Sequence, residues 1–376
     1  MNKKIISIGF ALLLFSVSII NLIIPQRSFS ENENRYLQML PALNFEDIIS
    51  GKYSENFASY SSDQFFSRDE WISLKTVAEL ALMKKDNGRI YFGSNNTLFD
   101  ATEKIDNKQL DKNTNVISEY VHTLKSTLPD LNATVLLIPT STEILSDLLP
   151  AYAPVPDQHA AIRKVSKQLN GKVTVYDPTD LLKANKNNYL YFRTDHHWTS
   201  AAAYFVYREW AKQTGLTPFS QDDTTVEQVS SSFYGTLYSK ANLFTIKPDL
   251  VMAYRPLKAT PVWANYGQDH ITQTLYFGEF LDKKDKYSYF LGGNKPAVEI
   301  KTGTKNGKTF MMIKDSYAHC FVPFLTSHFE KILVVDPRYF NVDYPTYAIE
   351  NHVTDILFLY NVPNFSTDKS LSRLVG

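Results

Sequence analysis

Five short apolar runs recur along the chain, and each stops at a polar residue or a proline. They are rich in β-branched and aromatic side chains and do not alternate with polar ones, which is typical of strands buried on both faces. Stretches with helical spacing lie between most of them. This succession predicts an α/β fold, a doubly wound parallel sheet of about five strands with ligands at the carboxyl ends. The runs cover residues 132–139, 172–177, 308–313, 331–336 and 354–360.

The remaining segments do not show this alternation of apolar runs and helical stretches. Residues 28–130 begin polar and irregular and then show helical spacing, so we interpret them as a stalk and N-terminal helices. Between residues 217 and 305 the helical periodicity is lost, and aromatic and turn residues are frequent. This pattern predicts a β-rich insertion that covers one side of the ligand-binding edge. We expect residues 28–376 to form one domain that includes these two segments.

The N-terminus is apolar and uncharged from Ile5 to Ile24. Twenty helical residues span about 30 Å, the thickness of the hydrocarbon core of a bilayer. The apolar part of a cleavable signal peptide is shorter, about 7–15 residues, and no A-x-A cleavage pattern follows here. Residues 1–27 therefore predict an uncleaved signal anchor, with Lys3 and Lys4 in the cytoplasm and the rest of the chain outside it. If the segment is cleaved, the protein is secreted.

Composition narrows the class of protein. The chain has 376 residues, of which 44% are hydrophobic, so it is long enough for a full core. Lysine plus arginine equals aspartate plus glutamate, at 39 each. Without an excess of positive charge we expect no nucleic-acid partner. The single cysteine, Cys320, excludes an intramolecular disulfide, so the domain depends on its core alone.

The segment TDHHWTS places one acid and two histidines side by side. In an extended backbone residues i and i+2 share a face, so Asp195 and His197 are expected to point the same way and His196 the other way. Arg193 would share the face of Asp195 and could pair with it. Thr199 or Ser200 is a good cap for the apolar-striped helix that follows. A carboxylate beside an imidazole fixes the tautomer of the ring, as in a nucleophilic triad.

A serine that could complete such a triad follows the run KTFMMI. Ser316 comes directly after Lys314 and Asp315, where the predicted strand ends. A serine in this turn can present its hydroxyl to a base and its own N–H to an oxyanion. The alternative is that Ser316 only caps a helix. His319 lies close in sequence, but only His197 has a carboxylate two residues before it.

Other polar residues follow predicted strands at the same edge of the sheet. Any of them could donate to an oxyanion or hold an acceptor, although polar residues at strand ends also serve as caps and turns. A further candidate lies in the loop FLGGNKP. The candidates are Thr140, Ser141, Arg338, Tyr339, Asn361 and Asn294.

A metal site is a competing interpretation of the paired histidines. Zinc needs three or four nitrogen, sulfur or carboxylate ligands. Adjacent histidines of an extended segment diverge, and the other six histidines are scattered without H-x-x-x-H spacing. We therefore predict no metal and no cofactor. A metal enzyme stays an alternative, which sensitivity to chelators would reveal.

Three motifs together carry a family resemblance. TDHHWT, KDSYA and VVDPRYF resemble the DHHW family of exported bacterial proteins, and ENRYLQMLP and NGRIYFG fit the same pattern. That family is similar to the alginate O-acetylation proteins of the AlgJ and AlgX type, whose SGNH-hydrolase-like domain carries Asp-x-His before the serine. The same order occurs here. The sequence departs from the Gly-Asp-Ser block of SGNH hydrolases at one position, because Lys314 stands in place of the glycine.

The resemblance implies roles and a reaction. Ser316 would be the acyl-accepting nucleophile, His197 its general base, and Asp195 the residue that orients His197. The implied reaction is O-acyl transfer, most simply of acetyl, to a cell-surface or secreted polysaccharide. A membrane-bound O-acyltransferase would pass the acyl group across the membrane. Two alternatives stay open: a carbohydrate esterase (deacetylase) of SGNH type, and a non-enzymatic partner in a polysaccharide modification complex.

Overall fold

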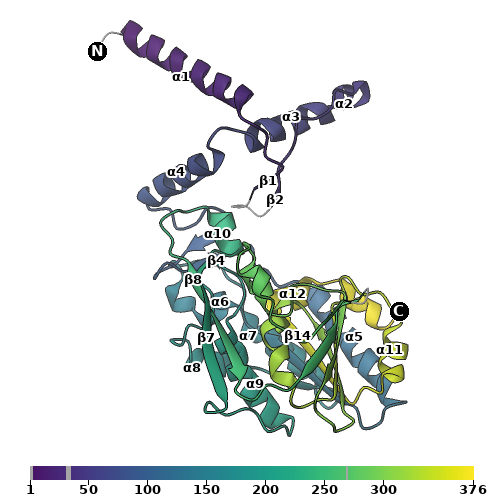
Figure 1. Cartoon of the computed structure of the whole chain (residues 1–376). Coiled ribbons are helices and arrows are strands. Elements are labelled where there is room, and N and C mark those ends of the chain that lie inside the picture. The colour runs from purple at the N-terminus through teal and green to yellow at the C-terminus, as the bar shows by residue number, and fades with distance from the viewer. Residues whose placement is uncertain (1–2, 31–34, 268–269) are drawn as a thin grey trace. The chain divides into compact units, whose positions relative to one another are not determined.

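The computed structural model describes residues 3–30, 35–267 and 270–376. The chain divides into two compact units (Figure 1). One comprises the chain up to Asn87 together with Tyr238–Ile246, and the other comprises Gly88–Leu237 with Lys247–Gly376. Helix α10 (Thr236–Ala241) spans a boundary between them in sequence. The predicted domain boundary after residue 27 stays a prediction.

The first unit contains the apolar N-terminal helix. Helix α1 (Lys3–Ile23) is long and apolar enough to cross a membrane. It is followed by short strands and by helices, in keeping with the helical spacing predicted within residues 28–130. These elements are β1 (Phe29–Ser30), β2 (Arg35–Tyr36), α2 (Phe45–Ile49), α3 (Lys52–Asp63) and α4 (Arg68–Ala81).

The second unit is built on an eight-stranded sheet of order β10-β9-β11-β13-β12-β14-β5-β6. The five strands from β13 to β6 run parallel, and they coincide with the five apolar runs of the sequence. The α/β prediction with about five parallel strands is therefore confirmed. The parallel strands are β5 (Asn132–Ile138), β6 (Thr174–Tyr176), β12 (Thr309–Lys314), β13 (Lys331–Val335) and β14 (Asp355–Asn361).

Successive residues of these strands enter two different hydrophobic clusters, because a strand alternates its side chains between the faces of the sheet. Leu136 belongs to the cluster that includes α9 (Ser200–Gln213), and Leu137 to the opposite one. Figure 1 shows α9 and α5 on different sides of β14. Burial on both faces explains why the runs lack a polar alternation. The second cluster takes in α5 (Asn107–Lys125), α7 (Gln158–Leu169), α11 (Tyr344–Glu350) and α12 (Val362–Thr367).

Residues 217–305 contribute strands in two places. β7 (Thr224–Phe233) and β8 (Asp249–Pro256) form a separate antiparallel pair. The other three strands extend the large sheet antiparallel, with β11 (Ala297–Thr302) pairing β13. The remaining two are β9 (Val262–Asn265) and β10 (Ile271–Thr272).

Short elements complete the second unit. They precede, connect or follow the strands, and several are single turns of 3-10 helix. They are β3 (Ile90–Phe92), β4 (Leu98–Asp100), α6 (Ser141–Ile144), η1 (Ser146–Leu148), α8 (Thr179–Ala184), η2 (Gly278–Phe280), η3 (Lys286–Tyr289), η4 (Ser316–Cys320), η5 (Val322–Leu325) and η6 (Ser370–Leu374).

The two-sided burial of β5 has a measurable consequence. Leu136→Ala and Leu137→Ala each remove a fully buried side chain from a different face, so each should lower the free energy of unfolding by about 2–5 kcal/mol. Val226→Ala on β7, where the side chain is 51% exposed, should change it by less than about 0.5 kcal/mol. Urea unfolding of the three variants measures the differences. If either Leu136→Ala or Leu137→Ala were as stable as the parent, the assignment of the core to both faces of this sheet would be contradicted.

Candidate active site

The segment Leu190–Thr199 folds into a tight loop whose two ends pair. Tyr191 and Trp198 form an antiparallel bridge. The Phe192 N–H donates to the His197 carbonyl oxygen at 3.3 Å, and the Thr199 N–H donates to the Leu190 carbonyl oxygen at 2.8 Å. Thr199 then caps α9 through its hydroxyl, as the sequence predicts. The acid and the two histidines therefore lie at the tip of a turn and not on an extended strand.

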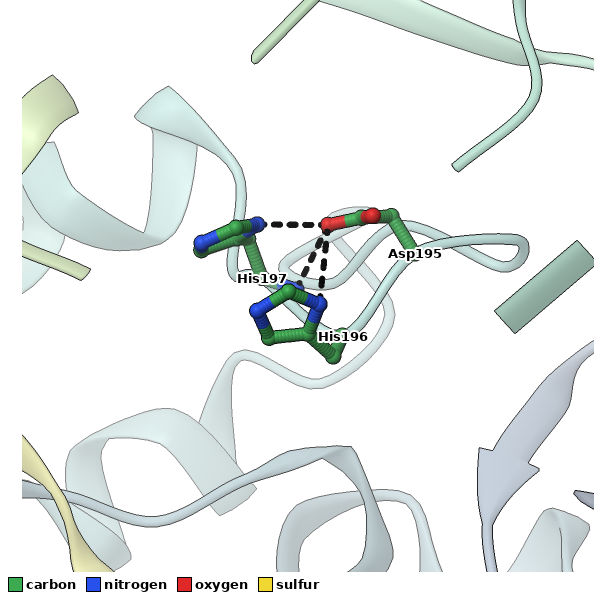
Figure 2. Close-up of side chains that lie close together, drawn as sticks. All are labelled: Asp195, His196 and His197. Atoms are coloured by element: carbon green, nitrogen blue, oxygen red, sulfur yellow. Dashed lines mark hydrogen bonds and ion pairs between the residues drawn. The ribbon is translucent and has the colours of Figure 1, made fainter. Parts of the chain in front are cut away.

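Asp195 is the centre of this turn, and both of its carboxylate oxygens accept hydrogen bonds. The contacts of one of them are drawn in Figure 2. Oδ1 lies 2.6 Å from Nδ1 of His197 and also accepts the His197 backbone N–H at 3.0 Å. Oδ2 accepts the backbone N–H of Thr236 at 2.8 Å and its hydroxyl at 3.1 Å. The carboxylate thus fixes both the ring and the backbone of His197.

Ser316 meets the other side of the same imidazole ring. It is the first residue of η4, directly after β12, and its Oγ lies 2.8 Å from Nε2 of His197. Because Nδ1–H donates to Asp195, Nε2 is left to accept the proton of the Ser316 hydroxyl. The cap of η4 is Asp315, which accepts the Tyr317 N–H. The alternative in which Ser316 only caps a helix is therefore wrong.

The charge of Asp195 is strongly favoured in this setting. Burial alone raises the pKa of its carboxyl, but the neighbouring His196 and His197 and the hydrogen bonds from His197 and Thr236 outweigh burial. The pKa of Asp195 is consequently held well below its usual range. An ionised carboxylate at this position stabilises an imidazolium if His197 takes up a proton.

His196 does not face away from Asp195, so that expectation is wrong. Its Nδ1 lies 2.6 Å from Oγ1 of Thr236 and 3.7 Å from Oδ1 of Asp195, and its ring centroid lies 3.8 Å from that of His197. Figure 2 shows both imidazole rings approaching the same carboxylate oxygen. The two histidines converge because the backbone turns here, whereas the expectation assumed an extended segment.

The convergence brings three possible metal ligands together. The ligand atoms of Asp195, His196 and His197 all lie within 4.8 Å of one another. The adjacent side chains of His196 and His197 therefore do not diverge, contrary to the expectation from an extended segment. His197 already uses one ring nitrogen for Asp195 and the other for Ser316. An ion bound through His197 would have to replace one of these two hydrogen bonds.

A second buried carboxylate, Asp249, fixes the start of the loop. It has no exposed surface and accepts the N–H of Thr194 at 2.8 Å, the Thr194 hydroxyl at 2.6 Å and the Arg193 N–H at 2.9 Å. The hydroxyl of Tyr189 also donates to it. The Nε atom of Arg193 lies 3.4 Å from Oδ1 of Asp249, so the expected pairing of Arg193 with Asp195 is wrong.

The turn that presents Ser316 depends on Asp315 in a similar way. Oδ2 of Asp315 accepts the Asn361 N–H at 3.0 Å and the side-chain amides of Asn361 and Asn364, each at 2.9 Å. Burial raises the pKa of Asp315, while these donors oppose that rise. The amide of Asn361 thus holds the residue before Ser316, and its candidate role as an oxyanion donor stays a prediction.

Tyr287 covers one face of the His197 ring. The two rings are stacked, with centroids 3.8 Å apart and an angle of 14° between their planes. The Tyr287 hydroxyl donates to the Ser316 carbonyl oxygen at 3.1 Å and contacts Sγ of Cys320 at 3.4 Å. Burial raises the pKa of Cys320 to about 12, so this thiol stays protonated and is a poor nucleophile.

Thr140 and Ser141 lie after β5, at the sheet edge where the sequence places them. The Thr140 hydroxyl donates to Oε2 of Glu103 at 2.9 Å, and Ser141 is buried at the start of α6. Within the described ranges neither residue hydrogen-bonds to Ser316, His197 or Asp195. Their roles stay predictions.

Arg338, Tyr339 and Asn294 lie beside β13. Arg338 binds Asp336 through Nε at 2.8 Å and through a terminal nitrogen at 2.6 Å. Asn294 Oδ1 lies 3.5 Å from Arg338, and the Tyr339 ring is 55% exposed. In the part of the chain that the structure describes, none of the three is hydrogen-bonded to Ser316. The Ser316 N–H donates no hydrogen bond there either, and it is therefore available to an oxyanion.

Lys314 is buried beside the turn. Its Nζ lies 2.9 Å from Nε2 of His319 and 3.4 Å from Oδ2 of Asp336. Burial lowers the pKa of Lys314 to about 8, against the opposing charge of Asp336. Burial, and then Lys314, lower the pKa of His319 well below its usual value. His319 therefore faces Lys314, and His197 is the histidine in contact with Ser316.

The parallel sheet, with a serine in the turn after an inner strand and Asp-x-His in a separate loop, defines an α/β protein of the SGNH-hydrolase-like class. The family model described as DHHW protein matches residues 121–335, which is more than half of the chain. The chain therefore belongs to the DHHW family, and the resemblance inferred from its motifs is confirmed.

Two solved structures share this fold, and a third is less similar. A DHHW family protein from Eubacterium siraeum is 23% identical with a TM-score of 0.64, over 74% of this chain and 91% of that one. Bacillus cereus PatB1 is 21% identical with a TM-score of 0.63, over 75% of this chain and 98% of that one. The O-acetyltransferase domain of Pseudomonas putida AlgJ is more distant, at 15% identity and a TM-score of 0.48, over 76% and 98%. A search of curated proteins finds no match.

Gly235 is a residue that the sequence did not single out. A Cβ atom there would lie 2.2 Å from Cβ and 2.3 Å from Oδ2 of Asp195, closer than side chains approach in folded proteins. Gly235→Ala should push the carboxylate away from His197. We expect the downfield proton resonance of the His197 Nδ1–H to be lost or shifted, and the free energy of unfolding to fall by about 1–3 kcal/mol. Proton NMR and urea unfolding measure the two effects.

Gly278→Ala is the matched control. Nothing lies within 4 Å of a Cβ atom at Gly278, and its backbone does not require a glycine. This variant should keep both the resonance and the stability of the parent. If Gly235→Ala leaves the resonance unchanged as well, then the close approach of Gly235 does not set the position of Asp195.

The buried Lys314 predicts a pH-dependent stability. Its folded-state pKa of about 8 lies below the unfolded value of 10.5, so between these values the unfolded chain holds a proton that the folded chain has lost. The free energy of unfolding of the parent, relative to Lys314→Met, should therefore rise by roughly 3 kcal/mol from pH 8 to pH 10.5 and stay level below pH 8. Urea unfolding across this range measures it. A difference that does not change with pH would show that Lys314 titrates normally.

Proposed function

We propose that this chain is an extracytoplasmic O-acyltransferase that works through a covalent acyl-Ser316. The supporting observation is the continuous chain of hydrogen bonds from Ser316 Oγ through both nitrogens of His197 to the buried Asp195. A nucleophile, a base and a group that orients the base are then in contact before any substrate binds. Ser316 is only partly buried, so its hydroxyl remains accessible.

In the first half of the reaction Ser316 Oγ attacks the carbonyl carbon of an acyl ester donor. His197 Nε2 takes the hydroxyl proton, and Asp195 stabilises the resulting imidazolium. The Ser316 N–H donates to the oxyanion of the tetrahedral intermediate, which then collapses. The donor alcohol leaves with the proton from His197, and the acyl group stays as an ester on Ser316.

In the second half an acceptor hydroxyl replaces the donor. His197 removes the proton of this hydroxyl, and the acceptor oxygen attacks the acyl carbon. The ester bond to Ser316 then breaks, and His197 returns a proton to Ser316 Oγ. We propose that the acyl group is acetyl and that the acceptor is a sugar hydroxyl of a cell-surface or secreted polysaccharide. If water attacks instead, the same residues make a carbohydrate esterase.

The location follows from the first helix. We propose that α1 anchors the chain in the cell membrane and leaves the second unit on the outer side, where polysaccharides are assembled. The acyl donor would then be delivered by a multi-spanning membrane-bound O-acyltransferase, because activated acyl groups are made in the cytoplasm. No step of the reaction requires a cofactor or a metal.

The test is to trap the acyl-enzyme. The full chain in detergent is incubated with 4-nitrophenyl acetate, and intact mass is recorded with time. We expect one acetyl group on the parent, none on Ser316→Ala, and formation slowed by about 10²–10⁴-fold in His197→Ala, because the general base is lost. Adding oligosaccharides then separates transfer, which yields acetylated sugar, from hydrolysis, which yields acetate.

Ser372→Ala is the control for the serine variant. Ser372 is exposed, and among the described residues its hydroxyl donates only to the nearby Lys369 carbonyl oxygen, so this variant should acylate like the parent. An adduct that persists in Ser316→Ala would place the nucleophile elsewhere. A folded parent that forms no adduct and does not turn over the donor would favour the non-enzymatic partner in a polysaccharide modification complex.

A further inference from the structure

A cavity of about 780 Å³ lies in the second unit, beside the antiparallel strands of the large sheet. Its volume falls within the range of about 300–1,000 Å³ that is typical of ligand sites in proteins. Aromatic rings make up much of the wall, and two lysines lie among them. The lining residues that matter for its chemistry are Tyr266, Phe277, Phe280, Lys283, Lys295 and Phe340.

Strand register places this cavity at the same edge of the sheet as Ser316. β11 runs antiparallel to β13, with Ala297 opposite Val335, so the start of β11 lies at the carboxyl end of β13. β9 runs antiparallel to β11 in turn, so Tyr266 follows β9 at this edge as well. Ser316 follows β12 at its own carboxyl end. The residues that line the cavity and the nucleophile therefore lie at the same edge of the sheet.

The strand order gives the distance across the sheet between the cavity and the strand that precedes Ser316. β13 lies between β12 and β11, and β9 comes next. Neighbouring strands are about 4.8 Å apart, so the cavity begins about 10–14 Å from the strand that carries Ser316. A polysaccharide whose reacting sugar is at Ser316 covers this distance within a few sugar units.

One buried residue, Asp336, bonds to both the cavity wall and the nucleophile turn. The Asp336 N–H donates to the Pro296 carbonyl oxygen at 3.0 Å, and its own carbonyl oxygen accepts the Phe340 N–H at 2.9 Å. The Asp336 carboxylate meanwhile binds Lys314, two residues before Ser316. The cavity wall and the turn therefore both bond to Asp336. Such a common attachment keeps a bound polysaccharide in register with the reaction centre.

The lining chemistry suits a carbohydrate that carries negative charge. Aromatic rings offer flat apolar faces to the C–H faces of sugars, and polar groups at the rim bind the hydroxyls. Lys283 lies over the Phe280 ring, with Nζ 4.4 Å from its centroid. Within the described residues the Lys295 ammonium has no ion pair. Among the lining residues that the structure describes, one acid, Glu279, accompanies the two lysines.

We propose that this cavity is a distal subsite for the acceptor, and that it holds an acidic stretch of the polysaccharide while a nearby sugar is acylated at Ser316. This inference rests on the proposed function. A pocket of about 660 Å³ that includes Asn132 and Thr174 does not compete for this role. Those residues start β5 and β6, so that pocket lies at the opposite, amino edge of the parallel strands.

The test separates binding from chemistry. Binding of a galacturonic acid hexamer and of chitohexaose is measured by calorimetry with the full chain carrying Ser316→Ala, which cannot be acylated. We expect the galacturonate hexamer to bind, Phe280→Ala and Lys295→Glu in this background to weaken it by at least about tenfold, and added salt to weaken it further. Chitohexaose, which is neutral, should bind more weakly and be insensitive to Lys295→Glu.

Matched controls come from the opposite end of the same strands. Lys301→Glu on β11 and Trp263→Ala on β9 change an exposed lysine and a half-exposed tryptophan that pair with each other away from the cavity. Both should bind like the parent. In chains that keep Ser316, the Phe280 and Lys295 variants should form acetyl-Ser316 at the parental rate but acetylate the galacturonate hexamer at least about tenfold more slowly.

The outcomes distinguish the two proposals. If the parent forms no acetyl-Ser316, the proposed function fails, while the binding arm still tests the cavity. If acetyl-Ser316 forms but neither hexamer binds, or the cavity variants bind and transfer like the parent, then the cavity is not the subsite. Preferential binding of chitohexaose would overturn the acidic character of the acceptor.

Discussion

The arrangement of the site depends on the burial of the Asp195 carboxylate. A carboxylate removed from water must have its oxygens satisfied by donors or opposite charge. Here one oxygen takes the His197 ring and backbone, and the other takes the backbone and hydroxyl of Thr236. The second set of donors lies about forty residues further along the chain, next to a glycine whose missing side chain makes the approach possible. Satisfying one charge therefore fixes the imidazole on one side and the 235–236 turn on the other. Ser316 then needs only to arrive at the remaining ring nitrogen, which the end of β12 brings about.

The turn at Ser316 forms without the glycine that SGNH hydrolases carry before their Asp-Ser pair. Lys314 stands where SGNH hydrolases carry glycine, but no residue from 314 to 316 has a positive φ. The backbone freedom of glycine is therefore not needed. Asp315 caps the turn from within and is held by two asparagines at the end of β14. The Lys314 side chain is accommodated because Asp336 offers a buried opposite charge beside it. The glycine of the usual motif is thus replaced by an arrangement of hydrogen bonds and one ion pair.

The sequence predicted those features that depend on local patterns and on strand order. The five parallel strands, the cap at Thr199 and the family all follow from residues close together in the chain. The orientation of His196 and the partner of Arg193 were wrong because both rested on an extended backbone for 193–197, and the loop turns there instead. Thr236, Gly235, Asp249 and Tyr287 were missed for a different reason. Each acts on the loop or on Ser316 across at least 29 residues of chain, as with Tyr287 to Ser316 and Asp249 to Arg193. Nothing in their local sequence marks them, since only the packing of the β7–β8 pair and the 285–294 loop brings them into place.

The mixed direction of the large sheet explains why so much of the chain lies beside one edge. In a purely parallel sheet only the ends of strands reach the ligand-binding edge, and each contributes one loop. Adding β11 in the reverse direction brings the beginning of a strand to that edge, together with the loop that precedes it. The loop carries Asn294 and Lys295 next to the residues that follow β13. A binding surface can then extend sideways from the nucleophile without disturbing the parallel core. The extra strands β9 to β11 join the sheet on the β13 side. On the other side the sheet ends at the short strand β6, and its neighbour β5 already contributes Thr140 and Ser141 to this edge.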